Sequence, residues 1–576
     1  MKDFKVYVQN RRAGWLRDLL ILTAVLGVPF FQFLGRLPLI DPDEGRYAEI
    51  PREMLERGDL ITPTLNYVKY FEKPPLLYWI NAASIRLFGP SEFAARLPSA
   101  LCGLLTVLAT YLITRKLYDR RTALFSAIIL GTSAGFVMQS RIILTDMLLT
   151  FCLTAALGAF IVAAQREGRR GGALPWYLFY LFCALAVLAK GLIGIVFPGG
   201  ICIIYLLVTG KWRVTLPRMR IVTGLLLFLG VTVPWFVAVS LQNPEFARFF
   251  FIHEHFERFT STVHGRSQPI WFFLPVLLGT MLPWSFLIPG ALVRAWSNRR
   301  HENGPPGLYL LIWIAVIFLF FSKSGSKLVP YILPIFPPLA ILIAHRITTL
   351  LEGRGRELKA AAIMLGATLT ILGLAGLGYA RLPHTVELMI GIAPQLAPPL
   401  QRFATTAPQL STTGCVVIGG LFLLQGLGVL ASIGRNPARM LAVISICAFL
   451  LEIFIPRFVM DKIADTESPR ALALKARSLA TPETRIVTFG PMQAVSWYTG
   501  KRVMVTGKID ELEFGSKQGD QSAWFPDRQA LVKLWNSESH VMIFLTKNEL
   551  SDLLPELHIS PRIQGESGRD LLIGNW

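Results

Sequence analysis

The chain has 576 residues, of which 53% are hydrophobic and only 16% are charged. This composition carries more apolar surface than one soluble globule can bury, so we expect a lipid bilayer to solvate much of the chain. The formal net charge of +20 would favour nucleic acid in a soluble protein, but here the basic residues gather in short loops between apolar stretches, and we expect no nucleic-acid partner.

Thirteen apolar stretches are long enough to cross about 30 Å of hydrocarbon as helices, which satisfy their own backbone hydrogen bonds. We expect these spans at 15–35, 93–115, 122–139, 143–165, 174–190, 191–210, 219–241, 270–293, 306–322, 329–348, 358–380, 412–433 and 437–456. The connections on one side are all basic, which places them in the cytoplasm. Residues 1–456 are therefore predicted to form a membrane domain, and the outer segments are periplasmic in a bacterium.

The first outer segment, 36–92, is too polar to cross the membrane, yet it carries Tyr47, Ile50 and Met54 at helical spacing. This pattern predicts interfacial helices that lie on the membrane around a catalytic loop. After residue 457 the composition becomes that of a soluble protein.

Two buried strands are predicted near the end of the chain, at 485–489 and 540–545, together with an amphipathic helix at 527–535. We therefore expect a small periplasmic α/β domain at 457–576. No catalytic group is predicted in this domain, so we expect it to act as a scaffold or as a docking site for the acceptor.

Three carboxylates, Asp41, Asp43 and Glu44, lie within four residues just beyond the first span. Facing a membrane cleft, such a cluster would act as a general base or bind a metal or a cationic sugar, because low dielectric strengthens each interaction. A solvated loop in which an aspartate caps the next helix explains the same residues. Both interpretations stay open at this point.

Lys73 lies at the predicted membrane interface between an acid, Glu72, and a proline pair. An ammonium there suits a lipid phosphate, although an interfacial lysine also serves as an anchor. Arg258, on another outer loop, would supply a second cation to the same phosphate or be an ordinary surface charge. His253 on that loop is a zinc-binding residue type, but its spacing from neighbouring ligands does not match a helical metalloprotease.

Asp146 lies inside the start of a predicted span, where an ionised group costs about 3 kcal/mol and is usually functional or paired. We expect its partner to be Arg141, five residues earlier, or another intramembrane cation. Lys190 and the run 322–327 also place cations at outer helix ends. They would line a phosphate cavity or anchor these ends at the interface.

Four motifs stand in order along the chain: DEGRYAE at 43–49, YFEKP at 70–74, RIILTD at 141–146 and KLVPYILP at 327–334. With these motifs the chain resembles the lipid A aminoarabinose transferase family, within the protein O-mannosyltransferase-like glycosyltransferases that use polyprenyl-phosphate sugars. The resemblance covers most of the membrane domain. It implies an α-helical GT-C-type fold with about 13 transmembrane helices, interfacial helices in the first outer loop and a periplasmic domain.

The resemblance also implies an activity. A 4-amino-4-deoxy-L-arabinose unit would move from undecaprenyl phosphate to a phosphate of lipid A at the periplasmic face of the inner membrane, which weakens the binding of cationic antimicrobial peptides. The lipid-phosphate linkage would supply the energy. Since no Gly-rich loop stands between a strand and a helix, we expect no nucleotide cofactor. We expect the enzyme to be monomeric.

The family's functional positions carry over residue by residue. The positions matching catalytic acids are Asp43, Asp146 and Glu44. The positions matching substrate-binding residues are Arg46, Tyr47, Lys73, Arg258 and Tyr331. Among these, Lys73 and Arg258 match cations that hold the donor phosphate. Glu72 and His253 match positions that hold a zinc ion in family members.

Two other functions compete with this interpretation. The same lipid carrier would serve an enzyme that moves another sugar, such as mannose, onto a protein. A lipid or sugar transporter would also place ionisable residues in the membrane, but here they gather at one face and not near the bilayer centre, which disfavours a transport path.

Overall fold

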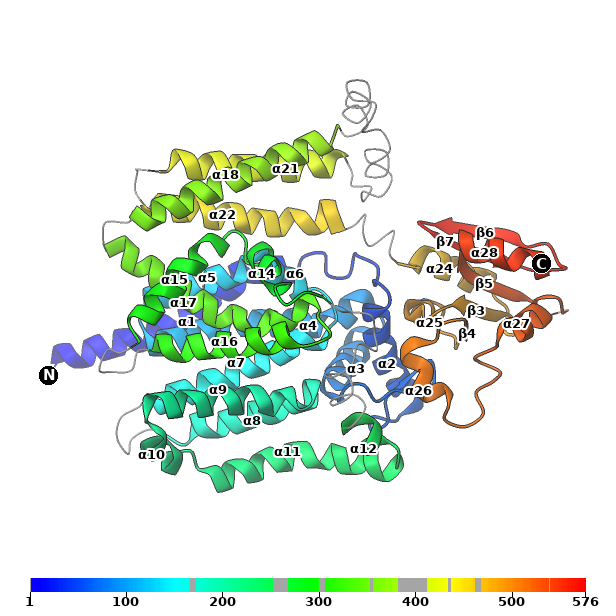
Figure 1. Cartoon of the computed structure of the whole chain (residues 1–576), viewed down its shortest axis with the longest axis horizontal. Coiled ribbons are helices and arrows are strands. Elements are labelled where there is room, and N and C mark those ends of the chain that lie inside the picture. The colour runs from blue at the N-terminus through cyan, green and yellow to red at the C-terminus, as the bar shows by residue number, and fades with distance from the viewer. Residues whose placement is uncertain are drawn as a thin grey trace.

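The computed structural model describes residues 2–165, 172–251, 268–299, 306–352, 356–381, 412–433, 437–460, 468–537 and 539–576. Within these ranges the chain forms a bundle of long helices followed by a small sheet domain. Figure 1 shows the helices side by side, with the sheet domain at the end of the bundle opposite the N-terminus.

Each of the thirteen predicted spans falls on a helix or on a bent pair of helices. Nine helices of the described ranges are long and apolar enough to cross a membrane, and three further spans are helix pairs bent by 65° to 117°. The remaining predicted span is the 17-residue helix α8 (Leu174–Lys190). The chain is therefore a multi-pass membrane protein.

The other helices of the bundle are α1 (Lys2–Phe31), α4 (Glu92–Leu117), α5 (Arg120–Gly131), α6 (Ala134–Ser140), α7 (Thr145–Ala164), α9 (Ile193–Thr209), α10 (Trp212–Thr215), α11 (Ile221–Gln242), α14 (Phe273–Thr280), α15 (Ile288–Ser297), α16 (Pro306–Lys323), α17 (Phe336–Glu352), α18 (Arg356–Tyr379), α21 (Thr412–Ala431) and α22 (Pro437–Ile455). Their burial differs widely. About 72% of the apolar window of α7 is buried inside the protein, against 17% for α11. Helix α11 is apolar all round and needs lipid as its neighbour, whereas α7 forms the rigid centre of the bundle.

The first outer segment forms α2 (Asp43–Arg57), the hairpin strands β1 (Thr64–Leu65) and β2 (Val68–Lys69), and α3 (Leu76–Phe88). Figure 1 shows α2 and α3 between the bundle and the sheet domain. The predicted apolar face of α2 is buried, but Glu49 and Glu53 are fully buried too. Protein therefore encloses α2 on its acidic side as well as on its apolar side, and the position of this helix at the membrane interface stays a prediction.

The C-terminal domain contains a five-stranded sheet of order β4-β3-β5-β7-β6. Its strands are β3 (Arg485–Phe489), β4 (Met504–Thr506), β5 (Val541–Thr546), β6 (Arg562–Ser567) and β7 (Asp570–Gly574), and its longer helices are α24 (Arg470–Leu479), α25 (Gln493–Thr499), α27 (Arg528–Trp535) and α28 (Lys547–Leu553). Strands β4, β3 and β5 run parallel to one another. Strand β7 runs antiparallel to both of its neighbours, β5 and β6. The two predicted strands are β3 and β5. The predicted helix is α27, whose first turn is capped by Asp527 through a 2.8 Å bond from the Ala530 amide.

Helix α25 docks on the start of α2. The Ala494 amide donates to Oδ1 of Asp41 at 2.9 Å, and the Leu39 amide donates to the Tyr498 hydroxyl at 2.8 Å. A Cβ atom added at Gly45 would lie 2.5 Å from the Ala494 nitrogen, so only glycine permits this approach. The two domains therefore meet at the first outer motif.

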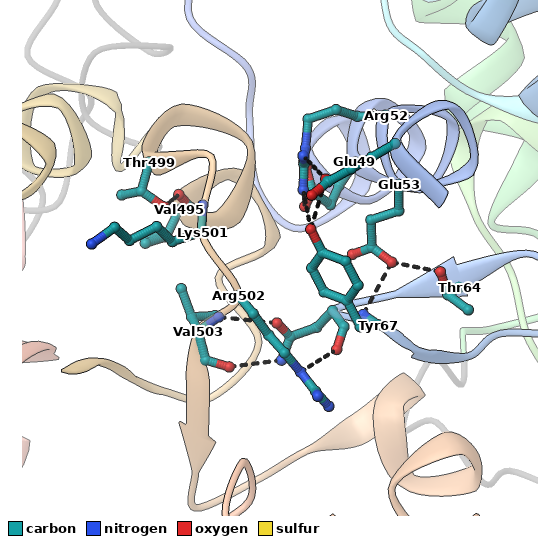
Figure 2. A network of polar contacts seen from close by, with 12 residues as sticks. Glu49, Arg52, Glu53, Thr64, Tyr67, Val495, Thr499, Lys501, Arg502 and Val503 are labelled. Carbon is teal, nitrogen blue, oxygen red and sulfur yellow. Dashed lines mark hydrogen bonds and ion pairs between the residues drawn. The ribbon is translucent and has the colours of Figure 1, made fainter. Parts of the chain in front are cut away.

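The hairpin makes a second junction with the C-terminal domain, drawn in Figure 2. The Asn66 amide exchanges two hydrogen bonds, of 2.8 and 3.1 Å, with the backbone of Val503. Arg502 donates to the Asn66 carbonyl at 3.1 Å. Beneath the hairpin, one oxygen of Glu53 accepts from the Tyr67 amide at 3.0 Å. The hairpin is thereby held from α2 and from the sheet domain at once.

Candidate active site

A cavity of about 280 Å³ lies where α2, the loop before α3, the start of α7 and the end of α8 meet the C-terminal domain. Its lining includes eight of the ten predicted site residues: Asp43, Glu44, Arg46, Tyr47, Glu72, Lys73, Asp146 and Tyr331. The other two, His253 and Arg258, lie outside the described residues. Residues far apart in the sequence therefore share one polar space at the outer end of the bundle.

Asp43 and Arg46 stand one turn apart at the beginning of α2. Nη1 of Arg46 donates to Oδ1 of Asp43 at 3.1 Å, and the side chains are 5% exposed for Arg46 and 49% exposed for Asp43. Nη2 of Arg46 donates to Oε1 of Glu511, from the C-terminal domain. Arg46 is thus held between two acids, and it orients an Asp43 carboxylate that stays accessible from the cavity.

Glu44 borders the cavity, but its carboxylate is occupied. Arg96 of α4 donates through Nε to Oε1 at 2.8 Å and through Nη2 to Oε2 at 2.6 Å, and the Ile40 amide adds a bond of 3.1 Å. Both side chains are almost fully buried. A two-point, buried pair of this kind fixes the loop to the bundle. In the structure Glu44 thus holds the loop in place, and its catalytic role stays a prediction.

Asp146 pairs with a lysine from the next span. Nζ of Lys190 lies 2.5 Å from Oδ1 of Asp146 and 4.7 Å from the centre of the Tyr331 ring. The predicted partner Arg141 instead donates to the backbone carbonyls of Pro29, at 2.6 Å, and Gln32, at 2.7 Å. The intramembrane cation that pairs with Asp146 is therefore Lys190. Its ammonium contacts two predicted site residues, Asp146 and Tyr331.

Lys73 lies three residues before α3 and contacts its neighbour Glu72. Its Nζ donates to the carbonyl of Glu72 at 2.9 Å and lies 3.8 Å from the Glu72 carboxylate, with side chains 15% and 9% exposed. Two prolines follow and limit the backbone before α3 begins at Leu76. A half-buried ammonium on such a rigid support is suited to a phosphate oxygen.

A zinc site would need more ligands than the described residues supply. Glu72 lines the cavity, but its carboxylate faces the Lys73 ammonium, and its predicted partner His253 is outside the described ranges. Within those ranges no three His, Cys, Asp or Glu side chains are grouped so that they would hold a metal ion. Zinc prefers four ligands in tetrahedral geometry, so zinc binding here stays a prediction.

Two polar residues of the cavity were not predicted from the sequence. Glu511 lies in the short helix η7 (Asp510–Leu512), and 465 positions separate it from Arg46. Gln139 lies near the end of α6. Neither belongs to a motif that indicates chemistry by itself, so only the fold places them at the cavity.

Asp41 also lines the cavity, at the junction of the two domains. Burial raises the pKa of this carboxyl from 3.8 to about 7, although its bond from the Ala494 amide acts in the opposite direction. Asp41 therefore titrates near neutral pH, on the side of α2 that contacts α25.

Comparison with known proteins decides the family. Residues 39–250 match the family of dolichyl-phosphate-mannose-protein mannosyltransferases, and residues 472–575 match the aminoarabinose transferase C-terminal domain. The undecaprenyl phosphate-alpha-4-amino-4-deoxy-L-arabinose arabinosyl transferase of Shewanella sediminis is 30% identical over 550 residues, which cover 92% of this chain and 95% of that protein. The chain belongs to this arabinosyl transferase family. The relative of the same name from Erwinia tasmaniensis is 36% identical over 354 residues, but this alignment covers 60% of the chain and only 63% of that protein.

Solved structures agree with this assignment. The crystal structure of ArnT from Cupriavidus metallidurans bound to undecaprenyl phosphate matches with a TM-score of 0.80 and 28% identity, over 98% of both chains. An oligosaccharyltransferase from Archaeoglobus fulgidus, with a TM-score of 0.51 and 15% identity over 85% of this chain and 64% of that one, shares the fold alone. The GT-C-type fold expected from the sequence is confirmed.

Proposed function

We propose that this arabinosyl transferase family member moves 4-amino-4-deoxy-L-arabinose from undecaprenyl phosphate to a phosphate of lipid A, at the periplasmic face of the inner membrane. The main support is one cavity at the outer end of the bundle lined by the acids Asp43 and Asp146 and by the cations Lys73 and Lys190. The names of the curated relatives supply the donor class.

The cations suit the donor. A phosphate diester carries one negative charge, and the departing undecaprenyl phosphate gains a second as the bond to the sugar breaks. An ammonium aimed at this oxygen binds the transition state more tightly than the ground state. We assign this role to Lys73, with Arg258 as the second cation implied by the family resemblance.

The reaction we propose is a direct displacement. An oxygen of the acceptor phosphate forms a bond to the anomeric carbon, while the bond from that carbon to the donor phosphate oxygen breaks and its electron pair leaves with undecaprenyl phosphate. Because a phosphate monoester is already ionised near neutral pH, with a second pKa of about 6, it needs no strong base. Asp43, oriented by Arg46 and accessible from the cavity, would then place the acceptor or stabilise positive charge on the sugar ring.

The charge balance of the cavity suits an amino sugar. Its lining contains six carboxyl side chains, those of Asp41, Asp43, Glu44, Glu72, Asp146 and Glu511, and three cationic ones, those of Arg46, Lys73 and Lys190. Glu44 is paired with Arg96, which lies outside the lining. The other five carboxyls face three cations, so a protonated amine on the sugar meets an excess of acids while the phosphates meet lysines.

The decisive experiment uses purified protein in lipid nanodiscs with the undecaprenyl phosphate-linked amino sugar and lipid A. We expect mass spectrometry to find lipid A enlarged by one aminopentose, and lipid A stripped of its phosphates to stay unmodified. Sugar attached to protein side chains would instead support a protein mannosyltransferase-like activity. Residues 39–250 match the family of dolichyl-phosphate-mannose-protein mannosyltransferases, which is the reason to test this alternative.

Two further assignments belong to this proposal. We infer that the enzyme acts as a monomer, and light scattering of the purified protein after size-exclusion chromatography tests this. Zinc binding by Glu72 and His253 is tested by metal analysis of the purified protein and of its Glu72→Gln and His253→Ala variants. Equal metal content in all three would remove these two residues as ligands.

A further inference from the structure

A second cavity, of about 310 Å³, lies between the β1–β2 hairpin, the outer end of α11 and the loop after α26 (Glu513–Ser516) of the C-terminal domain. Among the described residues its lining holds three glutamines, one asparagine, two threonines, one tyrosine and the two cations Arg57 and Lys69, and no carboxyl side chain. Amides and hydroxyls match the hydroxyl groups of a saccharide, whereas an apolar ligand would leave them without hydrogen bonds. The two cations suit an acidic substituent on that saccharide.

Hydrogen bonds and an ion pair hold the polar side chains of the second cavity in place. Arg57 donates to Oγ1 of Thr64 at 3.0 Å, and Lys69 pairs with Glu245, which lies outside the lining. Gln521 accepts from Arg502 at 2.7 Å, and this arginine also holds the hairpin. The carboxylate of Glu245, which pairs with Lys69, therefore lies outside the lining, whereas Arg57 and Lys69 themselves line the cavity.

The two cavities are close neighbours along two segments of the chain. Lys69 borders the second cavity and Glu72 borders the first, so their Cα atoms are at most about 11 Å apart. Glu511 borders the first cavity and Gly515 the second. A Cβ atom added at Gly515 would lie 2.5 Å from the Lys69 carbonyl oxygen, so this glycine lets the C-terminal domain close the wall of the second cavity.

We propose that the second cavity binds the remote acidic sugar of the acceptor, the ring that bears another phosphate or a carboxylate, while the reacting phosphate occupies the first cavity. This inference rests on the proposed function and specifies how the C-terminal domain takes part. Two adjoining polar cavities, joined by segments of three or four residues, match an acceptor whose anionic groups lie on neighbouring sugars.

The test compares two acceptors, a lipid-anchored disaccharide with two phosphates and the same lipid with one. Gln518→Ala removes a cavity amide, and Arg57→Gln removes a cavity charge. For each variant we expect KM for the two-phosphate acceptor to rise about tenfold, with kcat and the KM for donor unchanged. For the one-phosphate acceptor we expect Arg57→Gln to equal the wild type and Gln518→Ala to raise KM as well, because the sugar hydroxyls that the amide binds are present in both acceptors.

The matched control is Lys517→Ala. Lys517 is exposed, pairs with Glu513 and lies next to Gln518 without lining either cavity, so we expect this variant to behave as wild type with both acceptors. For Arg57→Gln, a KM that rises equally for both acceptors, or for neither, would overturn the inference. Absence of transfer by the wild-type protein with both acceptors would instead overturn the proposed function.

A competition experiment separates the saccharide from other anions. We expect a soluble disaccharide with two phosphates to compete with the acceptor in the wild type and to compete about tenfold less well in Gln518→Ala. Vesicles of an anionic phospholipid and inorganic phosphate are expected to show no such difference. If either shows the same difference, the cavity recognises a phosphate alone and the saccharide assignment is wrong.

Discussion

Nζ of Lys190 lies 2.5 Å from Oδ1 of Asp146, although 44 residues separate the two in the sequence. The pair joins the end of α8 to the start of α7, with side chains 10% and 9% exposed. Removal of one partner from such a pair leaves an uncompensated charge in a poorly solvated place, whereas removal of both costs far less.

Lys190→Met is therefore expected to destabilise the protein by about 3 kcal/mol. The double variant Asp146→Asn/Lys190→Met should recover most of that loss. The measurement is the thermal midpoint in detergent for the two single variants and the double variant. Equal midpoints for Lys190→Met and the double variant would show that the pair does not couple α7 to α8.

Asp43→Asn keeps the shape of the side chain and removes its charge. If Asp43 stabilises the sugar in the transition state, kcat should fall by about 100-fold with little change in either KM. The exposed Asp520→Asn serves as control, since this acid lies outside both cavities. Lipid A from cells that express Asp43→Asn should lack aminopentose at normal protein levels, and normal modification would remove Asp43 from the site.

Lys73→Ala should lower kcat/KM for donor about 10- to 100-fold, mainly through kcat, because the charged contact to the departing phosphate is lost. The KM for acceptor should not change. Lys73→Arg retains the charge and should recover part of the loss. An unaltered donor requirement in Lys73→Ala would mean that the lysine only anchors the segment at the interface.

Gly45→Ala places a methyl group against the backbone of α25. Overpacking of this kind costs about 1–3 kcal/mol, and here it should loosen the C-terminal domain and lower activity together with stability. Gly199→Ala in α9 is the matched control, since a Cβ atom there meets no neighbour within 4 Å. We expect limited proteolysis to release the C-terminal domain from Gly45→Ala faster than from Gly199→Ala.

Asp41 should make stability depend on pH. Since burial raises its pKa from 3.8 to about 7, the folded protein holds a proton that the unfolded chain releases. The stability contributed by protonated Asp41 is complete below pH 3.8 and is lost as pH rises to about 7. Asp41→Asn should therefore have a higher thermal midpoint than wild type at about pH 8 and an equal one near pH 4; equal midpoints at both pH values would refute this.

The membrane domain could be predicted from the sequence because bilayer thickness sets the length of a spanning helix. Two of the three bent pairs, α5 with α6 and α14 with α15, were predicted as single spans, since hydropathy reports length and not direction. Helix α2 shows a second limit: its spacing of apolar residues predicted one buried face, but Glu49 and Glu53 are buried too, and Glu53 is covered by Thr64 and Tyr67 of the hairpin.

The sequence predicted only those residues of the candidate site that belong to recognisable motifs. The motif residues Asp43, Lys73, Asp146 and Tyr331 line one cavity, although their roles await the variants above. The pairing of Asp146 with Lys190 joins two helices, and no spacing rule indicates which cation another span presents. Glu511 belongs to a domain without a catalytic pattern, so its contact with Arg46 emerges only after folding.

The contact between Arg46 and Glu511 sets an order of events during biosynthesis. Arg46 leaves the ribosome early and Glu511 almost last, and Glu511 must also pass the translocon before the two meet. A nascent chain arrested before that moment carries the donor-side lysine without a finished reaction chamber. In such a chain Arg46 lacks its second acid, so Asp43 is not yet held as it is in the folded protein.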